Sequence, residues 1–171
     1  QDIVRNIRDR LFKTRLLSAF DMSEEKIYEY ISIIRTYKPK HIFGYPSSIY
    51  LLAKFARQNN IKLHDIGVKV IFCTAERLYD HQRELILDVF GAPVANGYGG
   101  RDAGFIAHEC PHGSMHITAE SIIVEIVDHE GNPLPAGYSG EIVITHLDSH
   151  DFPFIRYKTG DVGALSEDTC S

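Results

Sequence analysis

Apolar residues at helical spacing predict three helices in the first half of the chain. The first helix begins after Ser23 and stops before Pro39, the second runs from Pro46 to about Asn59, and the third is closed by Gly91. Their apolar faces consist of Ile27, Tyr30, Ile31, Ile34 and Tyr37, of Ile49, Leu52, Ala53 and Ala56, and of Leu85, Ile86, Val89 and Phe90. Each helix therefore has one side suited to packing against a core.

Short apolar runs between these helices predict buried strands. The runs lie at residues 41–43, 69–73 and 93–96. Because strands and helices alternate over residues 40–96, we expect βαβ units, which build a parallel sheet.

The pattern changes after residue 100. Residues 122–127 and 141–145 are rich in β-forming residues, and the segment between them contains Gly131, Pro133, Gly137 and Gly140. Such a texture is typical of hairpins and antiparallel pairing. The predicted fold class is therefore α/β, with a parallel-sheet βαβ subdomain over residues 1–102 and a small, mostly antiparallel β subdomain over residues 103–171.

Composition and charge exclude several classes of protein. The chain has 171 residues, a net charge of −5 and 44% hydrophobic residues. This is the balance of a globular protein, without the clustered basic residues that nucleic acids or anionic membranes attract. No apolar run approaches the roughly 20 residues that span a bilayer, and no signal-like start is present.

The cysteines and the ends of the chain carry two further expectations. Three cysteines are too few and too odd in number for a disulfide framework, which favours a reducing, cytoplasmic compartment. The chain begins at Gln1 without a methionine and stops at Ser171 just after a charged loop. We expect it to be an internal piece of a longer protein.

A glycine-rich segment, residues 97–102, follows the third predicted strand. Ligands of α/β sheets lie beyond the carboxyl ends of strands, and glycines allow a backbone to approach a ligand closely. There Tyr98 can stack on a base, Arg101 can meet a phosphate and Asp102 can hold Mg²⁺. A tight turn with a surface Arg–Asp pair explains these residues equally well. The segment is neither a Walker loop nor a dinucleotide-binding fingerprint, because the glycine spacing differs.

Two more segments invite a binding role. Thr159, Gly160 and Asp161 form a predicted turn at the end of an apolar strand, where the carboxylate can accept hydrogen bonds from two sugar hydroxyls. Residues 74–76 follow the second strand, on what should be the same edge of the sheet. Each has a plainer explanation: Gly-Asp turns commonly close loops, and residues 74–76 can simply lead into the next helix.

Residues 108–116 hold the densest group of metal-binding side chains in the sequence. Cys110 and His116, together with the distant Cys170, provide three of the donors that zinc prefers. Histidines pointing into solvent from a surface loop are the alternative that the residues alone leave open. Cys73 lies inside a predicted strand and is expected to be an inert core thiol.

Taken together, these segments resemble successive motifs of the adenylate-forming ligases. The resemblance rests on residues 44–48, 74–76, 97–102 and 153–161, and on the turn residues between 128 and 145. Residues 20–23, together with Glu109, Cys110 and His116, are typical of the phenylacetate–coenzyme A ligase branch, which includes relatives in capsular polysaccharide synthesis and coenzyme F390 synthetase. The likeness covers about residues 20–170, and the order and spacing of the motifs make it specific.

The resemblance implies a two-step reaction. A small carboxylic acid, of aryl or arylacetic type, reacts with MgATP to give an acyl-adenylate and pyrophosphate, and coenzyme A then takes the acyl group. In this family Tyr98 would stack on adenine, with Gly99 beside it, and Asp161 would bind the ribose hydroxyls. The residues along the base would be Thr74, Ala75 and Glu76.

The resemblance also assigns the catalytic pair. Asp102 stands where the family has an acidic residue associated with Mg²⁺, usually Glu. Arg101 departs from the usual Thr that contacts the α-phosphate, and a guanidinium can replace that hydroxyl. Positioning and charge stabilisation are the main needs of such chemistry.

For the branch, the resemblance implies a structural zinc site built from a Cys-x5-His pair and a later Cys-x-Cys. Cys110 and His116 match the pair, and Cys170 matches the first cysteine of the later motif. The zinc would staple the β subdomain, since these residues lie outside the nucleotide motifs.

Other function classes remain open on the sequence. A nucleotide-binding module without ligase chemistry would keep Tyr98 and Asp161, and a zinc-stapled structural module would bind no nucleotide. We expect the 171-residue piece alone to form no acyl-adenylate, because the phosphate loop and the catalytic lysine of the family have no match in it. The oligomeric state is open, with a homodimer as one option.

Overall fold

The computed structural model of the chain describes residues 3–149, 151–152, 154–168 and 170. Its elements, in chain order, are α1 (Ile3–Leu11), α2 (Glu24–Tyr37), β1 (His41–Gly44), α3 (Pro46–Gln58), a short 3-10 helix (His64–Ile66), β2 (Val70–Thr74), α4 (Asp80–Phe90), β3 (Val94–Gly100), β4 (Gly104–Glu109), β5 (Met115–Ile117), β6 (Ile122–Val127), β7 (Gly140–His146) and β8 (Tyr157–Gly163). The three predicted helices are confirmed as α2, α3 and α4. The sequence patterns did not indicate α1.

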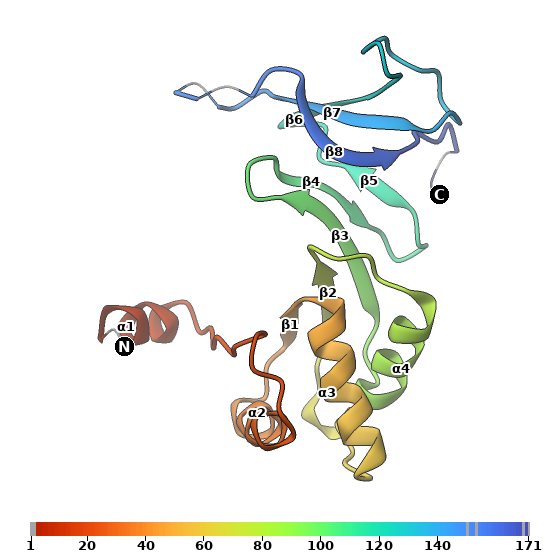
Figure 1. Cartoon of the computed structure of the whole chain (residues 1–171). Coiled ribbons are helices and arrows are strands. Elements are labelled where there is room, and N and C mark those ends of the chain that lie inside the picture. The colour runs from red at the N-terminus through yellow and green to blue at the C-terminus, as the bar shows by residue number, and fades with distance from the viewer. Residues whose placement is uncertain (1–2, 150, 153, 169, 171) are drawn as a thin grey trace.

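The first sheet contains five strands in the order β1-β2-β3-β4-β5. The pairs β1–β2 and β2–β3 are parallel, which confirms the predicted βαβ arrangement. Strands β4 and β5 continue the sheet in the antiparallel direction. Helices α2, α3 and α4 gather at one end of the molecule, away from the second sheet (Figure 1).

The main core lies between these helices and the parallel strands. Alternation along β2 buries Ile71 and Cys73 completely, while Phe72 on the opposite face is half-buried. Ile86 of α4 and Ala53 of α3 are also fully buried, and they belong to the same cluster. The apolar helix faces predicted from the sequence therefore meet on one side of the sheet.

Removing one fully buried side chain of this core should destabilise the chain measurably. Ile86→Ala is expected to lower the free energy of unfolding by about 2–5 kcal/mol, because it deletes three carbons from a site with no solvent access. The neighbouring Leu87 is 48% exposed, so Leu87→Ala should cost about 1 kcal/mol or less. Urea unfolding measures both, and equal losses would contradict the described packing.

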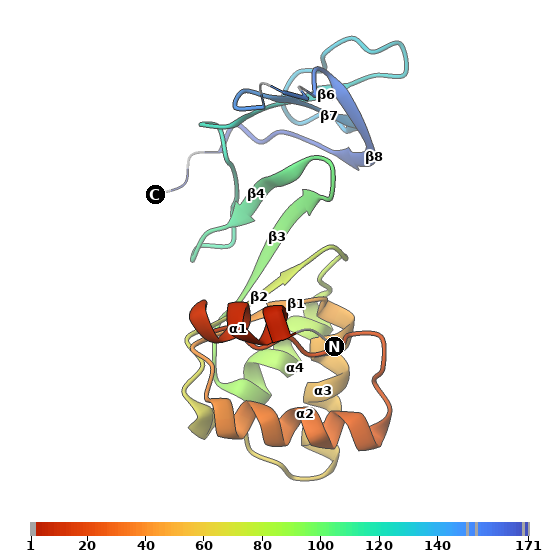
Figure 2. The same cartoon turned by 90° about the vertical axis from the view of Figure 1, so that its left-hand side faces the viewer.

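The second sheet is antiparallel, with the order β6-β7-β8. Its apolar face packs against the β3–β4 hairpin in a core of its own, formed by Ala103, Ile106, Ala107, Ile122, Ile126, Ile142 and Ile144. Figure 2 shows β3 and β4 running from the helical layer toward this sheet. The hairpin therefore belongs to the first sheet by hydrogen bonding and also contributes to the second core by packing.

The predicted boundary between the two subdomains crosses the first sheet. Residues 104–109 and 115–117 lie on the β-subdomain side of that boundary, and as β4 and β5 they extend the first sheet. The predicted boundary between residues 102 and 103 falls within the turn that joins β3 to β4. The change in texture near residue 100 marks the switch from parallel to antiparallel pairing, and the division into two subdomains is kept as a proposal.

Two glycine-containing segments also differ from the prediction, because both lie within strands. Gly97, Gly99 and Gly100 form the end of β3, and a Cβ on Gly99 would lie 2.3 Å from the carbonyl oxygen of Gly104 on the paired strand. Thr159, Gly160 and Asp161 lie inside β8, where Gly160 has a φ of +80°. Glycine is a poor strand former by propensity, so pairing with the neighbouring strands, and not local preference, makes these segments strands.

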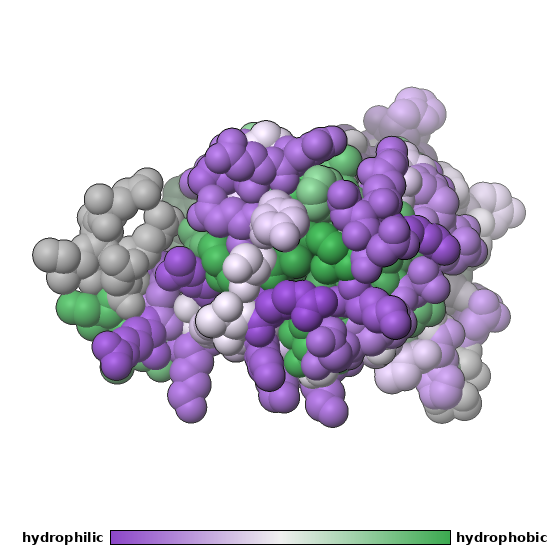
Figure 3. Space-filling model, turned by 90° about the horizontal axis from the view of Figure 1, so that it is seen from below, coloured by the Kyte–Doolittle hydropathy of each residue, from purple (hydrophilic) through white to green (hydrophobic). Residues whose placement is uncertain are grey.

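Three further features concern the helices. Ser23 is the N-cap of α2, but its hydroxyl donates to Asp21 and not to the helix. Seen from the helical end, hydrophilic side chains surround a central apolar strip (Figure 3). Within the described residues, every helix is too short or too polar to cross a membrane.

Candidate functional site

A polar cleft of about 200 Å³ lies where the β3–β4 hairpin meets the second sheet. One wall consists of residues 98–103 and Ile106. The opposite wall is formed by Tyr157, Thr159 and Asp161 of β8. The glycine-rich segment and the Thr-Gly-Asp segment, which the sequence singled out separately, therefore face the same space.

Tyr98 and Asp161 meet across this cleft. The Tyr98 hydroxyl donates to Oδ2 of Asp161 at 2.9 Å and lies 3.4 Å from Oγ1 of Thr159, joining residues 63 positions apart. Thr159 is itself fixed, because its hydroxyl donates to the carbonyl oxygen of Ile142 on β7. Burial raises the pKa of Tyr98, and the Asp161 carboxylate raises it further, so the phenol stays protonated and serves as a donor. Asp161 remains exposed and open to a ligand.

Arg101 and Asp102 occupy the turn between β3 and β4. Both side chains are exposed and both residues line the cleft. The Asp102 carboxylate accepts a 3.4 Å hydrogen bond from the Tyr157 hydroxyl of β8. The predicted catalytic pair thus lies at the mouth of the same cleft as Tyr98 and Asp161.

The third predicted segment, Thr74 to Glu76, lies beside the glycine-rich strand but does not line the cleft. Thr74 is the register partner of Gly97. Ala75 has a φ of +67°, a conformation that costs a non-glycine residue about 1–3 kcal/mol and is enriched at ligand sites. The Glu76 carboxylate accepts the N–H of Ser47 at the start of α3. A place for these residues along the base rests on the resemblance alone.

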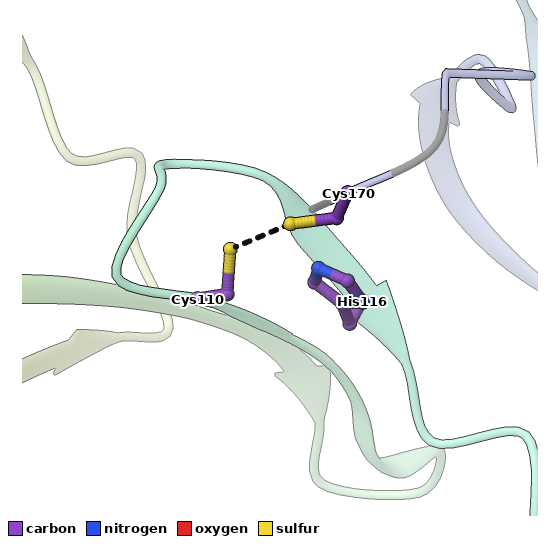
Figure 4. Close-up of side chains that lie close together, drawn as sticks. All are labelled: Cys110, His116 and Cys170. Atoms are coloured by element: carbon purple, nitrogen blue, oxygen red, sulfur yellow. Dashed lines mark hydrogen bonds between the residues drawn. The ribbon is translucent and has the colours of Figure 1, made fainter.

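A separate cluster forms at the turn between β4 and β5. The ligand atoms of Cys110, His116 and Cys170 all lie within 4.8 Å of one another, and the two sulfur atoms are 3.5 Å apart. Figure 4 shows a ring nitrogen of His116 facing both sulfurs. Nε2 of His116 is buried and has no hydrogen-bond partner among the described residues. Convergence of these three side chains was the geometric expectation from the sequence, whereas His108 and His112 are exposed.

The chemistry of this donor set suits zinc. A tight turn encloses Cys110, whose N–H donates to the carbonyl of Ser114 and whose carbonyl accepts from Gly113. Partial burial raises the pKa of Cys110, but hydrogen bonds from the His112 and Ser114 backbone and from Cys170, together with the adjacent His116 side chain, outweigh it and lower that pKa to about 6. Thiolates and imidazole are the ligands that zinc prefers.

Sequence reasoning missed an ion pair that anchors this turn. Nη2 of Arg83 donates to both carboxylate oxygens of Glu109 at 3.0 Å, and the backbone N–H of Asn96 donates to the same carboxylate at 2.7 Å. Arg83 also donates to the carbonyl oxygen of Val94. The side chain of Glu109 is only 11% exposed. No spacing in the sequence signals this contact, because it joins residues 26 positions apart on α4 and β4.

A mixed sheet, a small antiparallel sheet packed on its hairpin and a cleft between them match part of the fold of the adenylate-forming ligases. Residues 17–147 match the AMP-binding enzyme family, and the chain belongs to that family.

Relatives of known name agree with this assignment. The chain is 28% identical over 146 residues to protein CapK of Staphylococcus aureus, covering 85% of this chain and 31% of that protein. It is 27% identical over 146 residues to phenylacetate–coenzyme A ligase of Thermus thermophilus, covering 82% of this chain and 33% of that enzyme. The chain therefore spans about a third of the length of these relatives.

The fold comparison gives the same result. An open conformation of 2-hydroxyisobutyryl-CoA ligase, in complex with 2-HIB-AMP and CoA, superposes with a TM-score of 0.75 and 24% sequence identity, covering 84% of this chain and 35% of that chain. At this identity the similarity shows a common fold.

Proposed function

We propose that the chain forms part of an ATP-dependent carboxylate–coenzyme A ligase of the phenylacetate–coenzyme A ligase type. The enzyme joins a carboxylic acid to AMP, releases pyrophosphate and passes the acyl group to the thiol of coenzyme A. The observation that carries this proposal is the meeting of Tyr98 and Asp161 across the cleft, from two different sheets. Membership of the AMP-binding enzyme family supports it.

The nucleotide half of the site follows from the chemistry of these two residues. Tyr98 offers an aromatic face, on which adenine can stack. The Asp161 carboxylate can accept hydrogen bonds from both ribose hydroxyls. The hydrogen bond from the Tyr98 hydroxyl to Oδ2 fixes the orientation of this carboxylate. Gly99 lines the cleft beside Tyr98, and its lack of a side chain lets β4 pair closely with this part of β3.

The reacting half of the site is the turn with Arg101 and Asp102. The Arg101 guanidinium is suited to charge-assisted hydrogen bonds with the α-phosphate, whose charge grows in the transition state. Asp102 supplies the exposed carboxylate that would hold Mg²⁺, and the ion would neutralise phosphate charge when bound. The turn thereby positions and stabilises the reacting groups, which is the main requirement of adenylation.

Aromatic rings next to Gly97 support an aryl or arylacetic acid as the substrate. Phe72 and Phe105 lie 5.7 Å apart between ring centroids, and Phe43 stacks on Phe72 at 5.8 Å. A Cβ on Gly97 would lie 2.3 Å from the Phe72 ring, so this position needs glycine if the ring is to stay in place. These rings lie next to the glycine-rich strand, outside the lining of the cleft, and flat apolar faces of this kind suit a planar acyl group.

A structural zinc ion is part of the same proposal. Cys110, His116 and Cys170 would hold it, linking the β4–β5 turn to the segment that follows β8. The buried Nε2 of His116 without a hydrogen-bond partner and the low pKa of Cys110 support this assignment. The proposal also places the protein in the cytoplasm, where thiols stay reduced.

Substitutions at Tyr98 test the nucleotide site. Tyr98→Ala should weaken AMP binding roughly 5- to 150-fold, the loss of about 1–3 kcal/mol of stacking. Tyr98→Phe keeps the ring and loses the hydrogen bond to Asp161, so the loss should be about 2- to 10-fold. Isothermal titration with AMP measures both. The control is Tyr138→Ala, since Tyr138 is 63% exposed outside the cleft. Unchanged affinity in Tyr98→Ala would remove Tyr98 from the site.

A further inference from the structure

The turn with Arg101 and Asp102 needs support from outside its own strands. Gly100 and Gly104 are register partners, so residues 101–103 form a short hairpin loop with a glycine at each end. Gly104 has a φ of +68°. Glycines give a backbone many accessible conformations, and charge stabilisation requires groups held in place before the reaction. Contacts from the second sheet are therefore important for this loop.

His146, the last residue of β7, makes one such contact. Its Nε2 lies 2.8 Å from the carbonyl oxygen of Ala103, 43 positions away in the sequence. A carbonyl oxygen only accepts hydrogen bonds, so Nε2 must carry the proton. Ala103 is 3% exposed, and an unpaired carbonyl in such a position is costly. The imidazole thus holds the last residue of the loop to the second sheet.

A row of aromatic rings continues from His146 to the other side of the loop. His146 contacts Phe154 edge to face at 5.4 Å, and Phe154 contacts Tyr157 in the same way at 4.9 Å. The Tyr157 hydroxyl then donates to Asp102. The row therefore holds two consecutive residues of the loop, Asp102 by its carboxylate and Ala103 by its carbonyl.

We propose that His146 is a positioning residue for adenylation, which holds the Arg101–Asp102 loop in the arrangement that phosphate and Mg²⁺ require. This inference rests on the proposed function. His146 itself lines no part of the cleft, so it acts through Ala103. Tyr98 and Asp161 lie on strands, and their contact with the nucleoside does not depend on the loop.

The test separates the loop from the nucleoside site by comparing two substitutions at one position. His146→Phe keeps a ring beside Phe154 and loses the donor, whereas His146→Gln places an amide N–H near the position of Nε2. In the full-length protein, His146→Phe should lower the maximal rate of acid-dependent pyrophosphate release about tenfold and raise the Mg²⁺ concentration for half-maximal rate. AMP affinity should stay within about twofold of wild type, and His146→Gln should restore most of the rate.

Hydrogen exchange provides an arm that is independent of catalysis. In His146→Phe the amides of residues 101–104 should exchange faster, while those of β6 should not change. A wild-type rate and Mg²⁺ dependence in His146→Phe, or equal losses in His146→Gln, would overturn the inference. If the wild-type protein releases no pyrophosphate with any acid, the proposed function fails. The positioning role of His146 in adenylation then fails with it, even if hydrogen exchange shows that His146 stabilises residues 101–104.

Discussion

Asp161→Ala is expected to lower the rate of carboxylate-dependent pyrophosphate release by roughly two to four orders of magnitude in the full-length protein. The carboxylate can accept hydrogen bonds from both ribose hydroxyls, each worth about 1.5–3 kcal/mol when one partner is charged. Its loss also frees the Tyr98 hydroxyl, which bonds to Asp161 at 2.9 Å. A coupled assay for pyrophosphate measures the effect.

The fold should tolerate this substitution, because Asp161 is exposed. A melting temperature close to that of the wild type would show that the loss of rate is local. Asp88→Ala serves as the matched control: Asp88 is an exposed carboxylate of α4 that pairs with Arg57 of α3 and does not line the cleft. If Asp161→Ala releases pyrophosphate at the wild-type rate, Asp161 is not part of the nucleotide site.

Cys110→Ser is expected to abolish stoichiometric zinc binding and to lower thermal stability. Zinc bound at about 1,000 times its dissociation constant stabilises a fold by about 4 kcal/mol. For a chain of this size that is a shift of about 8–16 °C in the melting temperature. The metal content can be measured by mass spectrometry, and the melting temperature by scanning fluorimetry with and without a chelator.

Cys73→Ala is the control for the zinc prediction. Cys73 is a fully buried thiol of the main core, outside the cluster of Cys110, His116 and Cys170. Its loss should leave one zinc per chain, although the core is weakened. Wild-type protein that takes up no zinc from a small excess would contradict the assignment, as would Cys110→Ser protein that retains the metal.

Local sequence signals were sufficient for α2, α3, α4 and the parallel strands, but not for α1. Helices α2, α3 and α4 show apolar residues at helical spacing, and the strands between them are short continuous apolar runs. These two patterns differ, so the sequence predicts both the type and the order of the elements. The sequence did not predict the end of β3, which extends to Gly100. Gly97, Gly99 and Gly100 have low strand propensity, yet they pair with β4. A Cβ would clash with Phe72 at Gly97 and with the Gly104 carbonyl at Gly99.

The prediction of the nucleotide site required more than local sequence pattern. Tyr98 and Asp161 were separate candidates by residue type, and only the resemblance to family motifs assigned them to one site, since a contact between residues 63 positions apart has no signal in a single sequence. The same limit explains why the Arg83–Glu109 ion pair and the contact of His146 with Ala103 were missed. Cys110 and His116 were easier, because donor type and close spacing are visible in the chain itself.

Formation of an acyl-adenylate is the most direct test of the account. The full-length protein is incubated with ATP, Mg²⁺ and a panel of aryl and arylacetic acids, and acyl-AMP is quantified by mass spectrometry. The account predicts that at least one acid gives acyl-AMP together with an equal amount of pyrophosphate, and that added coenzyme A converts it to the thioester. Binding of AMP without acyl-AMP from any acid would indicate a nucleotide-binding module and contradict the ligase assignment.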